Sequence, residues 1–239
     1  MKKLIQRLLD EKTHKISGGI YDITQINMSY HSNRTEGSTT TEKQVTSLYM
    51  TGSIDLFYED NIVKLDDLIE NENHFRAFDY ILDNYKKDID LDFIKMIHKI
   101  LLSRTSKERL EWFNIGEFKK EQNVIGTYVE VSSPENVEKD LKKLLKKYNK
   151  KEKIELEDIA DFHYYFEKIH PFQDGNGRVG RLLMFKECIK NNVMPFIVLE
   201  THKNFYLRGL QEYENEKGYL LETFRFFQDE YENIMNKKK

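Results

Sequence analysis

The chain contains one stretch that concentrates chemically active side chains, His170-Pro171-Phe172-Gln173-Asp174-Gly175-Asn176-Gly177-Arg178-Val179-Gly180-Arg181. This stretch brings a histidine, a carboxylate, several glycines and two arginines close together in the sequence. On both sides, apolar residues recur three and four positions apart, which is the spacing of amphipathic helices. We therefore predict a loop that enters a helix near Gly177.

The start of that helix is a predicted phosphate site. Backbone amides in the first turn of a helix have no partner within it, and they lie at the positive end of its dipole. Gly175, Gly177 and Gly180 would let phosphate oxygens approach without meeting a Cβ atom. Arg178 and Arg181 are three residues apart, so their guanidinium groups share one helix face. Each can form two parallel hydrogen bonds to a phosphate.

Two side chains before the helix add a base and a metal ligand. His170 carries an imidazole that can accept a proton at neutral pH, so it is the candidate base for activating a hydroxyl. Asp174 offers the hard oxygen that Mg2+ or Mn2+ binds together with substrate phosphates. A calcium loop starting at Asp174 is rejected, because its twelfth position holds Phe185 instead of Glu. The combination predicts a nucleotide site with Phe172 as a core anchor.

The remainder of the sequence predicts an all-α fold. Helical periodicity covers most of the chain, and prolines stand only at positions 134, 171 and 195. The predicted helices are Lys2–Thr13, Tyr21–Glu36, Glu42–Thr51, Asn73–Tyr85, Asp92–Ser103, Pro134–Tyr148, Glu155–Ile169, Gly177–Asn191, Thr201–Glu216 and Tyr219–Asn236.

Local signals mark some of the helix ends and one break in the helical pattern. Thr41 to Gln44 has the form of a capping box, and Ser133 precedes a proline suited to the first helical position. Gly37 stands where a helix ending at Glu36 needs a left-handed residue. Between these regions, glycines and an alternating β-prone run predict a small β-hairpin over about Phe118–Val131.

Composition limits the classes of function. The 239 residues carry a formal net charge of -3, with a sequence pI near 6.2, so the protein as a whole does not attract nucleic acid. Cys188 is the single cysteine, which excludes an intramolecular disulfide. No apolar run has the length of a membrane span or an export signal. We expect a cytoplasmic protein that binds neither membrane nor nucleic acid directly.

The quoted stretch resembles the signature HPFx[DE]GNGRxxR of Fic-domain proteins and fills every fixed position of it. The resemblance implies a Fic-type helical bundle with a small β-hairpin flap. It places the Fic core, with flap and C-terminal helices, at residues 91–239. Residues 1–90 are then a helical extension that carries an inhibitory motif, and both parts form one compact unit.

The resemblance also implies a role for each signature residue. His170 would deprotonate a Ser, Thr or Tyr hydroxyl of a target protein, and Asp174 would hold the divalent cation on ATP. Asn176 would contact the α-phosphate, and the two arginines would hold the β- and γ-phosphates. Asp174 followed by Gly175 favours AMP transfer over the other reactions of the family. The implied nucleotide-binding residues are Gly175, Asn176, Gly177, Arg178, Gly180, Arg181 and Tyr206, although a core role for Tyr206 remains equally open.

A second motif lies near the N-terminus. Ser32-Asn33-Arg34-Thr35-Glu36-Gly37 resembles the inhibitory motif [ST]xxxE[GN] of the same family. The resemblance implies that Glu36 pairs with Arg181 and so blocks the γ-phosphate, with Ser32 one turn earlier bonding to the signature loop. Nearby hydroxyls are candidate self-modification sites, namely Ser29, Ser32, Thr35, Ser38, Thr39 and Thr40. An extended target segment would pair with the flap, through Gly126, Thr127, Tyr128 and Val129.

Three functions remain open from the sequence. The favoured one is a protein adenylyltransferase inhibited by its own Glu36, acting on a target protein and on itself. The second uses the same pocket in reverse, as a hydrolase that removes AMP from a modified protein. The third is a non-catalytic module that senses nucleotides or regulates a toxin. Related proteins form dimers, so we also expect a homo-oligomer.

Overall fold

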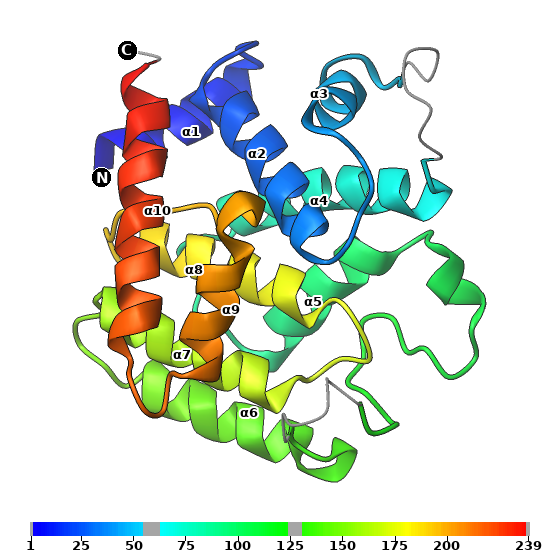
Figure 1. Cartoon of the computed structure of the whole chain (residues 1–239), viewed down its shortest axis with the longest axis vertical. Helices are drawn as coiled ribbons and strands as arrows, with labels where there is room; N and C mark the ends of the chain where they lie inside the picture. The colour runs from blue at the N-terminus through cyan, green and yellow to red at the C-terminus, as the bar shows by residue number, and fades with distance from the viewer. Residues whose placement is uncertain (1, 55–62, 124–130, 238–239) are drawn as a thin grey trace.

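The computed structural model describes residues 2–54, 63–123 and 131–237, and the regular structure in these ranges is entirely helical (Figure 1). This confirms the predicted all-α fold class. The elements in chain order are α1 (Lys2–His14), α2 (Ile20–Thr35), α3 (Glu42–Thr51), α4 (Leu65–Asp83), α5 (Leu91–Leu102), η1 (Ser106–Arg109), α6 (Pro134–Tyr148), α7 (Leu156–Ile169), α8 (Asn176–Lys190), η2 (Glu200–His202), α9 (Lys203–Gln211) and α10 (Gly218–Asn236).

Helix α8 runs through the middle of the bundle and packs against α2, α4, α5 and α7 (Figure 1). Every residue of α8 is buried except Gly177 and Lys190. A helix that is surrounded on all sides must satisfy any charge it carries inside the protein. The charged residues of α8 therefore determine which polar groups the neighbouring helices must bring inward.

Two apolar clusters hold α8 in place. The larger one joins Leu182 and Leu183 to residues of α4 and α5, such as Phe78 and Ile94. The second joins Met184 and Cys188 to the side chains of α9 and α10. Burying one large apolar side chain stabilises the fold by about 1.5–3 kcal/mol. Because both clusters pack against α8, most of the core fixes the position of the first turn of this helix.

Three helix ends follow the local signals in the sequence. Thr41 caps α3 with a reciprocal pair of bonds to Gln44, at 3.3 Å and 2.9 Å. Gly37 follows α2 with φ +95°, the left-handed conformation expected after a helix. Ser133 precedes Pro134 at the first position of α6, although its side chain makes no capping hydrogen bond.

Two predicted helices have the wrong limits. Helix α4 begins at Leu65, eight residues before the predicted start at Asn73. Its first two turns bury polar residues such as Asp67, Glu70 and Asn71, which hides the apolar period on which the prediction relied. The predicted helix Thr201–Glu216 is instead a 3-10 turn followed by α9, which ends at Gln211 before the chain turns back into α10.

The predicted β-hairpin is not seen in the part of the chain that the structure describes. Residues 118–123 and Val131 form no strand. The four predicted flap residues lie outside the described residues, namely Gly126, Thr127, Tyr128 and Val129. Within the described ranges, no helix combines the length and the apolar character that crossing a membrane requires.

Buried histidines make the fold sensitive to acid. His74, His98 and His163 are fully buried, and burial lowers the pKa of each to about 3. In the unfolded chain the same groups titrate near pH ~6.5, so below that pH the unfolded state binds more protons than the folded state. Stability is therefore expected to fall as the pH drops from about 6.5, by about 1.4 kcal/mol per histidine at pH ~5.5.

Urea unfolding at pH 7.5 and at pH 5.5 measures this effect. His74 is the sharpest probe because neither ring nitrogen has a hydrogen-bond partner in the described structure. His74→Leu should shrink the difference in unfolding free energy between the two pH values by about 1.4 kcal/mol. The matched change at the exposed His14, His14→Leu, should leave that difference as it is in the wild type. An unaltered difference in His74→Leu contradicts the prediction.

Candidate active site

The loop between α7 and α8 is closed by its own side chains. Helix α7 ends on His170, which takes the left-handed conformation with φ +50°. Asn176 then accepts a bond from the Phe172 amide and donates one to the Phe172 carbonyl, both at 2.8 Å. Both Oδ1 and Nδ2 of Asn176 thus form hydrogen bonds within the loop. The implied contact of Asn176 with an α-phosphate stays a prediction.

The side chain of His98 on α5 packs against the same loop and forms a hydrogen bond to it. Its ring stacks on Phe172 at 3.8 Å with an interplanar angle of 1°. Nδ1 accepts the Gly116 amide at 2.9 Å, so the proton resides on Nε2, which donates to the Asp174 carbonyl at 3.1 Å. Both nitrogens are occupied in the neutral ring, in agreement with a pKa that burial lowers to about 3.

The segment Lys119–Asn123, here called the strap, forms hydrogen bonds to the same loop. The Lys119 amide donates to the Pro171 carbonyl at 2.9 Å. Asn123 donates from Nδ2 to the carbonyls of Phe172 and Gln173, both at 3.1 Å. The signature loop is therefore bonded on three sides before any ligand binds, which favours a preorganised site.

The first turn of α8 presents unpaired amides. Gly175 precedes the helix with φ +79°, a left-handed conformation that favours glycine. The first intrahelical bond runs from Val179 to the Gly175 carbonyl at 3.0 Å. The amides of Asn176, Gly177 and Arg178 therefore come before the regular ladder and point out of the helix end, where an anion can bind them.

The glycines of the signature serve different neighbours. A Cβ atom on Gly177 would lie 2.4 Å from Oε1 of Glu36 and 2.8 Å from NH1 of Arg181, so the bare backbone admits both groups. A Cβ atom on Gly180 would instead meet Glu167 at 2.5 Å and the His163 ring at 2.9 Å. The structure thus places Gly180 against α7, where it permits close helix packing, and away from the predicted nucleotide.

Arg181 is bound by the end of α2. Its Nε donates to Oγ of Ser32 at 3.0 Å, and its NH2 donates to the Ser32 carbonyl at 3.0 Å and to Oε1 of Glu36 at 2.6 Å. The arginine is 3% exposed and the Glu36 side chain 32% exposed. Burial would raise the pKa of Glu36, but the charges of Arg181 and Arg178 outweigh it and lower the pKa, so the carboxylate is ionised.

A buried polar ladder fixes the end of α2 against α4. Asn71 accepts bonds from Ser29 at 2.9 Å and from Asn33 at 3.2 Å, and it donates to Thr40 at 3.1 Å. This ladder orients the turn that carries Glu36. It also buries most of the hydroxyls predicted as self-modification sites. Among those six residues, only Thr39 is exposed.

Arg178 has a carboxylate partner of its own that the sequence did not reveal. Its NH1 lies 2.6 Å from Oε2 of Glu70 on α4, and its NH2 lies 3.6 Å from Oδ2 of Asp174. The arginine is 2% exposed. Glu70 falls in the part of α4 that was predicted to be non-helical, so only the three-dimensional structure shows that it faces the site.

Asp174 is ionised and partly exposed. Oδ1 accepts the Gly175 amide at 2.6 Å, and Oδ2 lies 2.5 Å from Nζ of Lys107. Burial would raise the pKa of Asp174, but the charges of Arg178 and Lys107 outweigh it and bring the pKa to about 2. The side chain remains 40% exposed, so the carboxylate is within reach of solvent.

The candidate base is neutral in this environment. Burial, and then the charge of Lys119, lower the pKa of His170 to about 4. Lys119 itself is 3% exposed, and its Nζ has no hydrogen-bond partner in the described structure. Burial lowers the pKa of that ammonium to about 8. His170 can therefore accept a proton at pH 7.

Tyr206 belongs to the core. It is 2% exposed, packs in the second apolar cluster, and bonds through its hydroxyl to Nε2 of His163 at 2.7 Å. In this conformation the ring offers no surface to a nucleotide. Of the two roles that the sequence left open for Tyr206, the structure supports the structural one.

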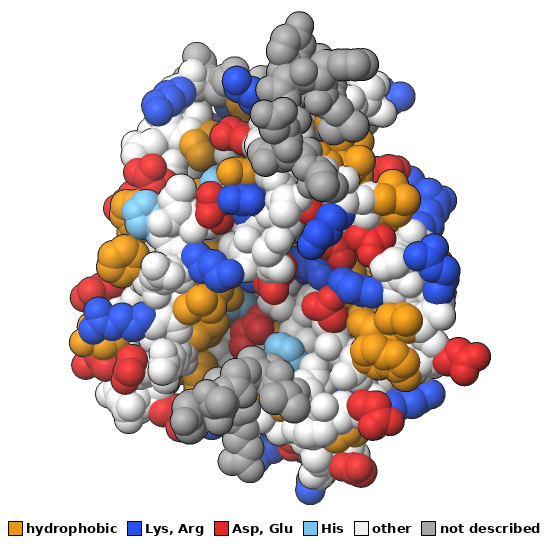
Figure 2. Space-filling model, turned by 45° about the vertical axis from the view of Figure 1, so that its right-hand side comes forward, with side chains coloured by type: hydrophobic (Ala, Val, Ile, Leu, Met, Phe, Trp, Pro, Cys, Tyr) orange, Lys and Arg blue, Asp and Glu red, His pale blue; other side chains and the backbone are white. Residues whose placement is uncertain are grey.

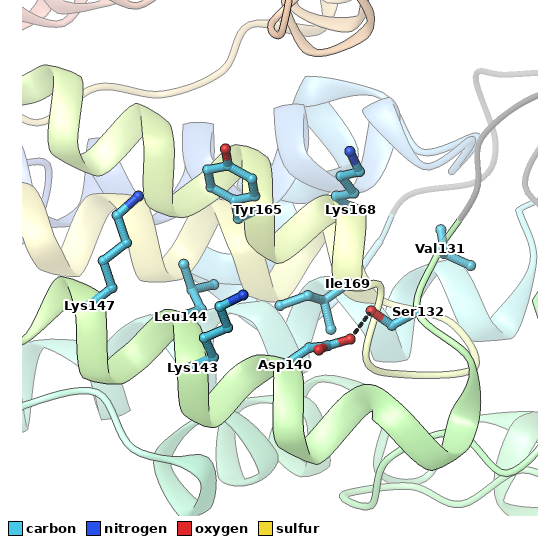
Figure 3. A pocket seen from close by; sticks show the side chains of 9 residues that line it. All are labelled: Val131, Ser132, Asp140, Lys143, Leu144, Lys147, Tyr165, Lys168 and Ile169. Atoms are coloured by element: carbon cyan, nitrogen blue, oxygen red, sulfur yellow. Dashed lines mark hydrogen bonds between the residues drawn. The ribbon is translucent and has the colours of Figure 1, made fainter.

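The Lys-rich helix α6 borders a different pocket. A pocket of about 480 Å³ lies between α6 and α7, with Lys143, Lys147 and Lys168 along it and Ile169 at its floor (Figure 3). None of the predicted site residues that the structure describes lines it. On the molecular face in Figure 2, acidic and basic side chains alternate instead of forming a patch of one sign.

These observations first define a class of site. Two buried guanidinium groups, an ionised carboxylate and a neutral histidine surround the free amides at the start of α8. Such an arrangement has the chemistry to bind a phosphate at a helix N-terminus and to accept a proton beside it. Of the predicted site residues that the structure describes, Gly180 and Tyr206 face α7 and the core, and the others lie around the start of α8.

The sequence comparisons then identify the domain. Residues 88–188 match the model of the Fic/DOC family, and the chain contains a Fic domain. It is 28% identical to protein adenylyltransferase Fic-1 of Caenorhabditis elegans over 130 residues, which are 53% of this chain and 24% of that protein. It is 26% identical to protein adenylyltransferase Fic of Nematostella vectensis over 190 residues, 77% of this chain and 42% of that protein. The chain thus spans less than half the length of these relatives.

Solved structures show the same fold. A Fic-domain signaling protein from Bacteroides thetaiotaomicron superimposes with a TM-score of 0.76 at 21% identity, covering 97% of this chain and 94% of that one. Fic-1 of C. elegans gives a TM-score of 0.72 at 19% identity, covering 99% and 72%. The arrangement of helices, including the N-terminal ones, is therefore shared along nearly the whole chain.

The role of His98 can be tested by stability. His98→Phe retains an aromatic ring against Phe172 but leaves the Gly116 amide and the Asp174 carbonyl without their partner. Each unpaired buried group should cost about 1–3 kcal/mol of unfolding free energy, measured by urea unfolding at pH 7.5. The exposed counterpart His14→Phe should change it by less than about 0.5 kcal/mol. Equal stabilities of the two variants would show that His98 does not hold the loop.

Proposed function

We propose that this protein transfers AMP from ATP to a hydroxyl group of a target protein, and that its own α2 holds it inactive through Glu36. The observation that carries the proposal is the pairing of Arg181 with Glu36 directly over Gly177, at the end of α8 that presents free amides. An arginine needed for a phosphate is bound there by a carboxylate of the same chain. The names of the relatives, protein adenylyltransferases, support the choice of reaction.

The geometry supports a direct displacement. The amides at the start of α8 would hold the phosphates, and Arg178 and Arg181 would neutralise their charge once released from Glu70 and Glu36. His170 would take the proton of the target hydroxyl, whose oxygen then forms a bond to the α-phosphorus. The bond from that phosphorus to the bridging oxygen breaks, and pyrophosphate leaves. Positioning and charge neutralisation would supply the acceleration.

The site also fits a divalent cation. Asp174 is ionised and partly exposed, and Mg2+ commonly binds one carboxylate together with substrate phosphates. Within the described residues no group of three potential ligands occurs, so the phosphates would have to complete the coordination. When bound, the cation would neutralise phosphate charge. Asp174 would hold it, and Lys107 links Asp174 to a second carboxylate, that of Glu70.

Inhibition would follow from competition for Arg181. Glu36 and a γ-phosphate both require NH2 of this arginine, and both require the space above Gly177. A charge-assisted hydrogen bond is worth about 1.5–3 kcal/mol. Loss of Glu36 should therefore raise the rate of transfer about 10- to 100-fold.

The proposed activity is tested with ATP labelled on the α-phosphate, Mg2+ and cell lysate. Label on protein should increase about 10- to 100-fold in Glu36→Gly relative to the wild type. It should fall by about 10²–10⁴-fold when His170→Ala is added to Glu36→Gly, because the base is lost. Label that enters only from γ-labelled ATP would indicate a kinase. If a protein that already carries labelled AMP loses it in the presence of the wild type but not of Glu36→Gly, the reverse reaction is indicated.

The protonation state of the base can be measured directly. In an NMR titration the His170 ring should stay neutral down to pH ~5.5, with its signal assigned by its loss in His170→Gln. Lys119→Met should raise the pKa of His170, since a positive charge beside the ring is removed. The control Lys95→Met removes a lysine that pairs with Glu117 and should have no such effect. A His170 pKa near ~6.5 in the wild type contradicts the described environment.

A further inference from the structure

Lys107 lies at the centre of the candidate site, although neither sequence motif includes it. It belongs to the short turn η1, which follows α5. The turn is fixed to α4, because the Ser106 amide donates to Oδ1 of Asp66 at 2.9 Å. Thr105, just before it, donates to the Leu102 carbonyl at 2.8 Å. Lys107 therefore enters the site from a well-anchored segment.

The ammonium of Lys107 lies between two carboxylates. Nζ is 2.9 Å from Oε1 of Glu70 and 2.5 Å from Oδ2 of Asp174. Both acids also face Arg178, at 2.6 Å and 3.6 Å respectively. Two positive and two negative groups thus form a closed ring in which each charge has two partners. The ring is electrically neutral without any bound ion.

The intact ring opposes binding of a divalent cation at Asp174. The ammonium of Lys107 lies at hydrogen-bond distance from Oδ2, and a second cation there would be repelled at short range. The lysine nevertheless has an alternative partner. When Arg178 turns to a phosphate, Glu70 loses one of its two cations, and Lys107 can pair with Glu70 alone. Every charge in the site then keeps a partner.

We propose that Lys107 closes the cation position beside Asp174 until a nucleotide is present, so that cation and nucleotide enter the site together. The proposal rests on the proposed function, which supplies the nucleotide. It makes Lys107 a positioning residue that acts through Asp174 and Glu70. Without the lysine, these two carboxylates would form an open cation site in the empty protein.

Binding of Mn2+ in the absence of nucleotide tests the proposal, with free Mn2+ measured by electron paramagnetic resonance at pH 7.5. Lys107→Met should bind Mn2+ about tenfold more tightly than the wild type, because the short-range repulsion between the ammonium and the divalent cation is removed. Lys107→Arg keeps the positive charge and should resemble the wild type. Adding Asp174→Asn to Lys107→Met should return the affinity to the wild-type value. A gain in affinity cannot arise from a variant that fails to fold.

A matched control removes another lysine from a carboxylate. Lys190 is the last residue of α8, at the end opposite to the site, and it pairs with the exposed Asp88, so Lys190→Met should leave Mn2+ binding unchanged. The proposal is overturned if Lys107→Met binds Mn2+ no more tightly than the wild type, or if the gain survives Asp174→Asn. Because no ATP is present, the result is independent of the transfer assay. Failure of AMP transfer and failure of this inference can thus be told apart.

Discussion

Two guanidinium groups are buried at the start of α8, and the rest of the site follows from the need to neutralise them. An uncompensated charge inside a protein costs several kcal/mol, so each arginine requires a carboxylate in contact. Arg181 obtains Glu36 from α2, and Arg178 obtains Glu70 from α4. The N-terminal helices are thus part of the site's electrostatics as well as of its packing. A nucleotide would offer the same arginines an alternative set of negative charges.

The loop before α8 is rigid for a different reason. Its backbone groups bond to side chains of α5, of α8 and of the strap at Lys119–Asn123, and these bonds exist without ligand. Rigid donors lose little freedom when they bind an anion, which favours both affinity and catalysis. The adjustable parts are long side chains: Glu36, Lys107 and the two arginines. Switching between an empty and a loaded state therefore requires side-chain rotations more than movement of the loop.

The sequence predicted the parts of the molecule that depend on local pattern. Helical periods, the cap at Thr41 and the left-handed Gly37 depend on neighbours in the chain, and they were predicted correctly. The signature residues were recognised because twelve consecutive positions carry them. In contrast, Glu70 and Lys107 reach the site from distant segments. Nothing in the sequence distinguishes them from ordinary charged surface residues. His98 was equally hidden, since one histidine on an apolar helix face is also typical of a structural core residue.

The limits of α4 show why a helix that buries polar groups is missed when helices are predicted from the spacing of apolar residues. Its first turns face the arginines, so they carry Asp67, Glu70 and Asn71 where a helix usually presents aliphatic residues to the core. A pattern method reads such a segment as exposed. For Tyr206 the sequence left a nucleotide contact and a core role equally open, and the structure buries this residue against His163. In both cases the deciding information is the identity of a neighbour distant in sequence.

The bare backbone at Gly177 makes mutations unequal in their effects. The same empty volume admits the carboxylate of Glu36, and in the proposed function a phosphate would pass through it to reach the amides. A side chain at position 177 would then exclude both groups, whereas a change at position 36 would remove only the proposed inhibitor. If the proposed function holds, a lineage of this protein could lose inhibition by a single substitution at position 36 and keep its transfer activity, but it could not fill the space above Gly177 and remain active.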